Sequence, residues 1–201
     1  MLKTFRESLC AGILIAIGGT VFLSCADKVV GSVFFSVALL CICYKGYYLF
    51  TGKIGYAVEQ HKRSDMVNLA VGLAGNLVCT FLLGMLLRRV LPDIGDKAAE
   101  MCTAKLLQSP LGTFVRGTLC GVLMYLAVSI YKEKNTALGV LFCVPVFILC
   151  GFEHSIADMY YFGASGNFNP KIITFMALVV AGNTVGAMAI LALKGVHTNE
   201  K

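Results

Sequence analysis

The side chains best suited to chemistry lie together in one polar stretch inside an otherwise apolar region: Glu153, His154, Ser155 and Asp158. The ordinary pKa of histidine, about 6.5, lets His154 donate a proton or a hydrogen bond near neutral pH, so we predict that it acts on a ligand. A charged side chain at the centre of a bilayer costs roughly 2.5–3.5 kcal/mol on insertion scales, so each needs a partner or a purpose. We predict that Glu153 accepts hydrogen bonds from irregular backbone, and that Asp158, one helical turn after His154, is its partner or lines a polar cavity.

A second polar stretch, Lys45–Lys53, interrupts an earlier apolar region, and both stretches fall near the middle of their regions. We expect helices to restart after Gly52 and around Ser155. Restarting helices direct unpaired N–H groups and the positive ends of their dipoles towards the centre, which favours an anion. Thr51 and Ser155 can cap these helices or bind the ligand directly.

The two stretches occupy matching places in a repeated sequence. Gly75-Asn76-Leu77-Val78 follows the first and Gly182-Asn183-Thr184-Val185 follows the second, which indicates two repeats of three helices each. An odd number of spans gives the two repeats opposite orientations. Polar interruptions at equivalent positions of inverted repeats predict a substrate site at the midplane of the membrane, where broken backbone is tolerated if it lines a cavity.

The composition places these helices in a lipid bilayer. The 201 residues are 58% hydrophobic and only 14% charged, with a mean hydropathy of +0.80, so a soluble globular domain is excluded as the default. We predict an all-α membrane protein in which residues 1–201 form a single integral membrane domain. Its six spans are expected at about 8–26, 29–60 (broken), 66–87, 111–131, 136–162 (broken) and 172–193. The connection from 88 to 110 has room only for an amphipathic helix at 96–107.

Charge and cysteine content bear on the partners, the orientation and the cofactors of the protein. The net charge of +6 is scattered between apolar runs, so we expect no nucleic-acid partner. The short basic loops 60–65 and 131–135 favour cytoplasmic termini in the cell membrane. Most of the nine cysteines lie in apolar runs without CxxC or zinc-type spacing, which indicates reduced packing residues and no metal or cofactor. Only Cys25 and Cys102 fall near membrane exits.

The first region, preceded by Lys3 and Arg6, also fits a signal peptide, but its short link to the next region favours a helical hairpin.

The most specific segments are Leu49-Phe50-Thr51-Gly52 and Gly151-Phe152-Glu153-His154-Ser155-Ile156-Ala157. With Ala11-Gly12 and Gly182-Asn183, they make the chain resemble the formate/nitrite transporter family over nearly its whole length. The resemblance implies an aquaporin-like protomer, a homopentamer with one pore in each protomer, and a channel or transporter, not an enzyme. By motif it assigns Thr51, His154 and Asn183 to the pore, Phe35, Leu39 and Phe147 to apolar constrictions around it, and Arg116 to a supporting position in the fourth span.

These positions suggest how a small anion of a weak acid crosses the lipid. A bare anion between apolar rings loses hydration that their walls cannot replace. We therefore expect the anion to gain a proton, or a strong hydrogen bond from His154, and to pass as a nearly neutral acid. Formate, nitrite, hydrosulfide and lactate all satisfy these requirements equally.

The chain departs from the family pattern at several places. Tyr48 stands where an acidic residue is usual, and Lys53 and Asp158 each stand where asparagine is usual. Lys45 has no usual counterpart, and we expect it to add positive charge near the pore or to pair with Asp158 or Glu153. The departures leave the architecture intact but bear on selectivity.

Three other interpretations remain open from the sequence. Gly163-Ala164-Ser165-Gly166 matches the GxSG pattern of rhomboid proteases, but the only histidine after Ser165 is His197 in the tail, so we interpret the motif as a loop. A metalloenzyme built on His154 and Asp158 needs ligands that the chain does not obviously supply. The third is an unrelated six-span transporter.

The GxxxG spacings at 117–121 and 182–186 predict close helix packing, within a protomer or between protomers.

Overall fold

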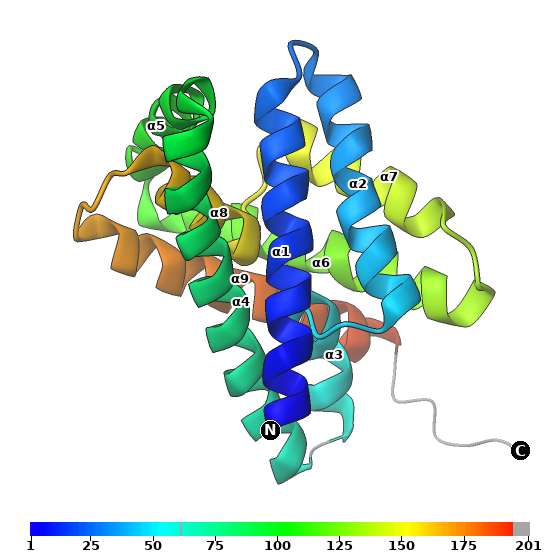
Figure 1. The fold of residues 1–201 in the computed structure, drawn as a ribbon. Coiled ribbons are helices and arrows are strands. Elements are labelled where there is room, and N and C mark those ends of the chain that lie inside the picture. Colours follow the sequence, from blue (N-terminus) through cyan, green and yellow to red (C-terminus); the bar gives the residue numbers. More distant parts are fainter. Residues whose placement is uncertain (61, 195–201) are drawn as a thin grey trace, which may run out of the picture.

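A computed structural model of the chain describes residues 1–60 and 62–194, without the side chains of 58–60 and 194. Within these ranges it is entirely helical, as predicted (Figure 1). The helices are α1 (Leu2–Ser24), α2 (Lys28–Lys45), α3 (Phe50–Gln60), α4 (Arg63–Val90), α5 (Pro92–Leu106), α6 (Pro110–Lys134), α7 (Leu138–Leu149), α8 (Ser155–Ser165) and α9 (Lys171–Lys194).

Five of the described helices are long and apolar enough to cross a membrane: α1, α2, α4, α6 and α9 over Lys171–Leu193. The remaining predicted span consists of two short helices, α7 and α8, so a count of six requires that this pair be taken as one crossing. Side-chain N-caps mark the beginning of two of the long helices. Asp27 accepts from the backbone N–H of Val30 at 2.8 Å before α2, and Ser109 accepts from that of Gly112 at 3.1 Å before α6.

Both predicted helix breaks are present and have the same backbone geometry. Gly46 ends α2 with φ +69° and Gly151 follows α7 with φ +66°, a left-handed conformation that glycine adopts without a steric cost. The next residue in each case donates its N–H five residues back, from Tyr47 to Ile42 at 3.1 Å and from Phe152 to the carbonyl of Phe147 at 2.9 Å. These are the bonds of a Schellman motif, and they turn the chain sharply at each break.

The breaks are shorter than the sequence suggested. The first covers residues 46–49 and the second 150–154. The expected restart after Gly52 is wrong, because α3 begins at Phe50 and so contains Thr51 and Lys53. Asp158 likewise belongs to α8.

The helices pack in matching pairs in the two repeats. α1 packs against α4 in the first repeat, and α6 packs against α9 in the second. The GxxxG glycines lie inside the second of these contacts: a Cβ on Gly121 would be 2.2 Å from the carbonyl oxygen of Asn183, and one on Gly186 would be 1.9 Å from that of Thr118. The motifs therefore bring helices together within the protomer.

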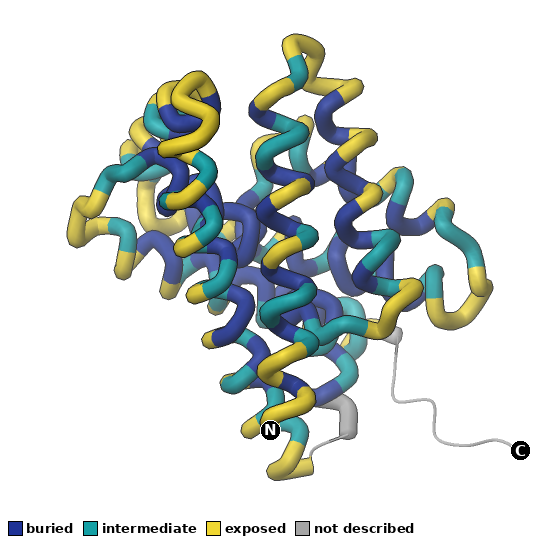
Figure 2. The backbone as a smooth tube through the Cα atoms, in the orientation of Figure 1, coloured by how far each residue is buried: buried dark blue, intermediate teal, exposed yellow. Residues whose placement is uncertain are grey.

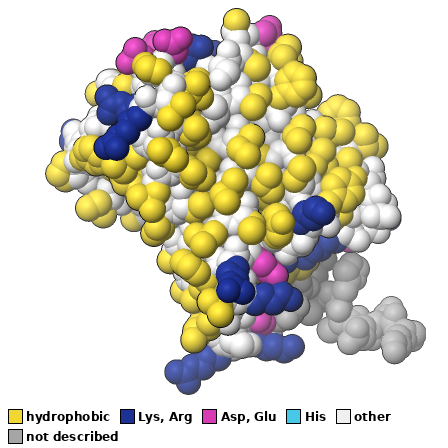
Figure 3. Space-filling model, viewed as in Figure 1, with side chains coloured by type: hydrophobic (Ala, Val, Ile, Leu, Met, Phe, Trp, Pro, Cys, Tyr) yellow, Lys and Arg dark blue, Asp and Glu magenta, His cyan; other side chains and the backbone are white. Residues whose placement is uncertain are grey.

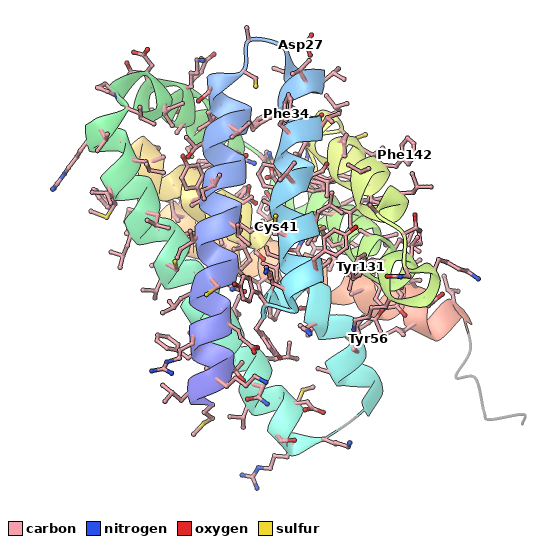
Figure 4. All side chains as sticks on the ribbon, turned by 45° about the vertical axis from the view of Figure 1, so that its right-hand side comes forward. Asp27, Phe34, Cys41, Tyr56, Tyr131 and Phe142 are labelled. Atoms are coloured by element: carbon pink, nitrogen blue, oxygen red, sulfur yellow. The ribbon has the colours of Figure 1, made fainter. Side chains whose placement is uncertain are left out.

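The outer surface fits a multi-pass membrane protein. Buried residues line the interior of the helix assembly (Figure 2). Hydrophobic side chains cover the middle of the face in Figure 3, whereas Lys, Arg, Asp and Glu gather towards its two ends. Phe34 of α2 and Phe142 of α7 project from this outer surface, 55% and 69% exposed (Figure 4). Such an apolar band is suited to lipid or to another protomer.

Candidate functional site

At the centre of the molecule, His154 of the second break meets Thr51 in the first turn of α3. His154 Nε2 lies 2.9 Å from Thr51 Oγ1, and both residues are buried. The other ring nitrogen, Nδ1, accepts a hydrogen bond from the backbone N–H of Ala157 at 3.1 Å. An accepting Nδ1 carries no proton, so in the neutral ring the proton is on Nε2, which points to Thr51. His154 is therefore both the N-cap of α8 and a donor at the midpoint of the fold.

Two asparagines hold the ends of the broken helices. Asn76 Oδ1 accepts from the N–H of Phe50 at 2.9 Å, and Asn76 Nδ2 donates to the carbonyls of Ser8 at 2.8 Å and Tyr48 at 3.0 Å. These bonds tie the start of α3 to α1 and to the preceding break. Because the amide is buried, it replaces water as the partner of three backbone groups.

Asn183 repeats this arrangement in the second half of the chain. Its Oδ1 accepts from the N–H of Ser155 at 3.0 Å, and its Nδ2 donates to the carbonyls of Gly117 at 2.9 Å and Glu153 at 2.8 Å. Both amide hydrogens are thus bonded to the backbone. Asn183, predicted for the pore, thus holds the start of α8 through the residues on either side of His154.

Aromatic and aliphatic side chains enclose the His154–Thr51 pair. The ring of Phe147 stacks on the imidazole of His154, with centroids 5.6 Å apart, and Phe35 meets Phe147 edge-on at 6.3 Å. Leu39 lies one helical turn after Phe35 on α2, and it borders a cavity of about 130 Å³ together with Leu49. All these side chains are buried. Sequence reasoning missed Leu49, although it stands two residues before Thr51 in the first break.

An ion cluster lies beside His154, and its cation is a residue that the sequence did not single out. Lys105 of α5 forms an ion pair with Glu153 and another with Asp158, the latter at 2.9 Å. Gln108 Nε2 donates to Glu153 Oε1 at 2.7 Å. Burial by itself lowers the pKa of Lys105. The negative charges of Asp158 and Glu153 raise this pKa by more than burial lowers it, so the net shift is upward and the ammonium stays charged.

The expected pairing of Lys45 with Glu153 or Asp158 is wrong. Lys45 is exposed at the end of α2, and neither Glu153 nor Asp158 pairs with it. A signal for Lys105 was present: Ile94, Ala98 and Cys102 form the buried face of α5, and Lys105 continues that spacing. A charge on the apolar face of an amphipathic helix requires a buried partner, which here is α8.

Two further expectations for the second break need correction. Ser155 does not cap α8, because His154 does so; its Oγ is buried without a hydrogen-bond partner among the described residues, as is Asp158 Oδ2. The Asp158 carboxylate bonds to Lys105 and not to His154. Arg116 supports the break as predicted in outline: its guanidinium donates to the carbonyl of Gly151 at 3.1 Å.

Comparison with known proteins shows which family has this arrangement. A model of the formate/nitrite transporter family matches residues 1–195. The chain belongs to the formate/nitrite transporter family. The resemblance carried by the two break motifs is thereby confirmed, and an unrelated six-span transporter is excluded.

The relatives include transporters from several organisms. An uncharacterised transporter, YwcJ, of Bacillus subtilis is 31% identical over 163 residues, 74% of this chain and 64% of the relative. The nitrite transporter NirC of Escherichia coli is 27% identical over 180 residues, 79% of this chain and 67% of NirC. The chain thus spans just under two thirds of the length of YwcJ.

Solved structures share the fold. A pentameric formate channel with formate bound superposes with a TM-score of 0.75 at 23% identity, covering 96% of this chain and 95% of that one. An ion channel of the same family superposes with a TM-score of 0.74 at 23% identity, over 96% and 87% of the two chains. The fold expected for a formate/nitrite transporter is therefore present.

The features behind the enzyme interpretations do not come together in this family member. Gly163, Ala164 and Ser165 belong to the last turn of α8 instead of a loop, and the Ser165 hydroxyl donates to the carbonyl of Phe162 at 2.8 Å. His197 lies outside the described residues. Among the residues that the structure describes, no group of His, Cys, Asp and Glu has the geometry to hold a metal ion, and each of the nine cysteines is free.

Proposed function

We propose that the protein is a channel or transporter for small monovalent anions of weak acids, such as formate, nitrite or hydrosulfide, across the cytoplasmic membrane. The observation that carries this proposal is the hydrogen bond between His154 and Thr51 at the meeting point of two broken helices. Helices α3 and α8 both begin there, so the positive ends of two dipoles meet a donor side chain. Membership of the formate/nitrite transporter family supports transport, and the class of anion is part of this proposal.

The apolar side chains around His154 make the passage of a charged anion unfavourable. An anion that passes Leu39 and Leu49 on one side, or Phe35 and Phe147 on the other, leaves much of its hydration behind. Burial of an unpaired charge costs far more than burial of a neutral polar group. A hydrogen bond from His154 Nε2 stabilises the anion at this point. A proton that the anion takes up from the aqueous solution on the entry side, and carries with it, removes the charge altogether.

Proton supply distinguishes the two forms of this mechanism. If His154 only donates a hydrogen bond, the anion carries its charge through the membrane. If the anion crosses as the neutral acid, a proton accompanies it, and transport is electrically silent. We favour the second form, because Phe35, Phe147 and Leu39 offer no polar partner to a charged species.

We further propose that residues 1–201 act as one membrane domain in a homopentamer, with both termini on the cytoplasmic side. The broad apolar surface and the likeness in fold to a pentameric channel support this assembly. Mass measurement of the detergent-solubilised protein by light scattering tests it, and a monomeric mass refutes it.

Flux through proteoliposomes tests the function. We expect imposed gradients of formate or nitrite to produce rapid swelling in liposomes that contain the protein, and chloride or glycerol gradients to produce none above empty liposomes. His154→Asn retains a side chain that can donate a hydrogen bond but cannot titrate. This variant is expected to change the pH dependence of flux. An identical pH profile in wild type and variant would refute the assigned role of His154, and absence of anion flux in the wild type would refute the function.

A further inference from the structure

A buried cluster of one cation and two carboxyl groups lies where α5 packs against α8 (Figure 1). Lys105 of α5 pairs with Glu153 and with Asp158, whose side chains are only 1% and 2% exposed. If all three groups were ionised, one negative charge would stay uncompensated inside the protein. A buried charge without a partner is so costly that a titratable group gives up its charge instead, which for a carboxylate means taking up a proton.

The titratable neighbours of this cluster do not supply the missing positive charge. Cys102 of α5, Cys120 of α6 and Tyr161 of α8 interact with it electrostatically, and each of them is neutral when protonated. His154 precedes α8 and accepts on Nδ1 from the backbone N–H of Ala157, so its ring is neutral as well.

The other helices that pack on α8 add no charge next to Asp158. Helices α1, α3 and α9 meet α8 or its N-cap through uncharged side chains: Thr20, Thr51 and Asn183. Arg88 of α4 also approaches α8, but it does so at Gly166, about two helical turns beyond Asp158. Lys105 is therefore the cation that both carboxyl groups share.

Hydrogen bonds show which carboxyl group is better stabilised as an anion. Both oxygens of Glu153 have donors, Lys105 at Oε2 and Gln108 at Oε1. Asp158 Oδ1 lies 2.9 Å from Lys105 Nζ, but Oδ2 is buried and no donor reaches it among the described residues. The two carboxyl groups are within hydrogen-bonding range of each other. Such a bond forms only when one of them carries a proton, because an ionised carboxylate has no donor.

We propose that Asp158 is a proton-binding site: its carboxyl holds a proton on Oδ2, shared with Glu153, and the anion reaches His154 most readily in that state. The proton comes from the aqueous solution and returns to it, and no other bond is made or broken. With the proton, the cluster is neutral. Without it, the cluster has a net negative charge one helical turn from His154 and repels the anion.

This inference rests on the proposed function and adds to it a titratable group besides His154. Because Asp158 stands where the family pattern usually has asparagine, which does not titrate, the site is a property of this chain and not of the family.

The first experiment compares formate flux into proteoliposomes for wild type and Asp158→Asn across a range of pH. Asparagine keeps a neutral side chain of nearly the same shape at every pH. The titration of formate is common to both proteins, so it cancels in the ratio of variant flux to wild-type flux. We expect this ratio to rise about tenfold from acidic to alkaline pH, because two unit charges about 10 Å apart, at an effective dielectric constant of about 20, change the occupancy of the centre by roughly that factor.

Glu100→Gln is the matched control, because Glu100 is an exposed carboxylate on α5, the helix that also carries Lys105. The ratio of its flux to wild-type flux should stay constant with pH. Size-exclusion profiles and melting curves verify that each variant is folded. Glu153→Gln takes the place of Asp158→Asn if the latter does not fold, because a single carboxylate that faces Lys105 needs no proton.

Infrared spectroscopy detects the proton directly and requires no transport. Exposed carboxyl groups are ionised at neutral pH, so a carboxylic-acid C=O band at that pH comes from a buried protonated group. In a detergent without ester groups, we expect the wild type to show such a band, Asp158→Asn to lose it and Glu100→Gln to keep it.

The two experiments fail in different ways. A wild type without the band at neutral pH, or the same band in Asp158→Asn, overturns the proton-binding site. A flux ratio that stays constant with pH, or one that rises equally for Glu100→Gln, overturns its effect on transport. No formate flux in the wild type overturns the proposed function, whereas the infrared spectra still decide whether Asp158 holds a proton.

Discussion

Replacement of Asn183 by alanine probes the framework that holds the histidine. The substitution removes one acceptor and two donors, and it leaves the N–H of Ser155 and the carbonyls of Gly117 and Glu153 without their partner. Asn183 is fully buried, so bulk water does not replace it. Each buried polar group left unpaired costs about 1–3 kcal/mol, and three of them give at least about 3 kcal/mol.

Thermal and denaturant unfolding of the detergent-solubilised protein measures this loss. Asn76→Ala should be destabilising by a similar amount, because Asn76 makes the same three kinds of bond in the first repeat. Asn68→Ala is the control: Asn68 is partly buried near the start of α4 and accepts one hydrogen bond, from Thr4 at 3.0 Å. Its loss should cost about 1 kcal/mol.

The same variants separate stability from transport. If Asn183 positions the start of α8, its loss also displaces His154, which precedes that helix and bonds to Thr51. Formate flux should then fall in Asn183→Ala at temperatures where the protein is still folded. A midpoint of unfolding for Asn183→Ala no lower than that of Asn68→Ala would refute the reasoning, whatever the flux.

Two other predictions follow from the helix contacts. Lys105→Met leaves Glu153 and Asp158 buried without their cation and should destabilise the fold by about 3–5 kcal/mol; the triple variant with Glu153→Gln and Asp158→Asn should recover most of this in the same unfolding assay, and a lack of recovery would show that the charges are not the cause. Gly186→Ala places a Cβ 1.9 Å from the carbonyl oxygen of Thr118 and should cost about 2 kcal/mol or more, as expected for overpacking, with a lower melting midpoint; an unchanged midpoint would mean that α6 and α9 can separate freely.

The sequence predicted the all-helical fold and the two breaks, because apolar runs and the polar stretches that interrupt them are local features of the chain. The start of α3 was misplaced for a physical reason. The group that accepts the first N–H of α3, at Phe50, is the side chain of Asn76, 26 residues away. Thr51, the predicted local cap, lies inside α3 and bonds to His154 instead. A cap that another helix supplies depends on tertiary packing and cannot be found by inspection of neighbouring residues.

The ion cluster was mispredicted for the same reason. The sequence predicted that Glu153 accepts hydrogen bonds from irregular backbone and that Lys45 can pair with Glu153 or Asp158, but the Glu153 carboxylate accepts from the side chains of Lys105 and Gln108. The cation comes instead from α5, which lies between the two repeats in the chain and has no counterpart within them. Only the packing of α5 on α8 brings Lys105 to the carboxylates.

The hydrogen bonds of the two asparagines reveal which residues of the repeats are equivalent. Asn76 bonds to the carbonyl of Tyr48 and the N–H of Phe50, and Asn183 makes the same bonds at residues 153 and 155. The residue enclosed between these contacts is Leu49 in the first repeat and His154 in the second. One backbone framework thus presents an apolar side chain at one helix break and an imidazole at the other. The apolar member borders the cavity between α2, α3 and α6, so in the proposed mechanism an anion that enters from that side meets Leu49 before it reaches the donor at His154.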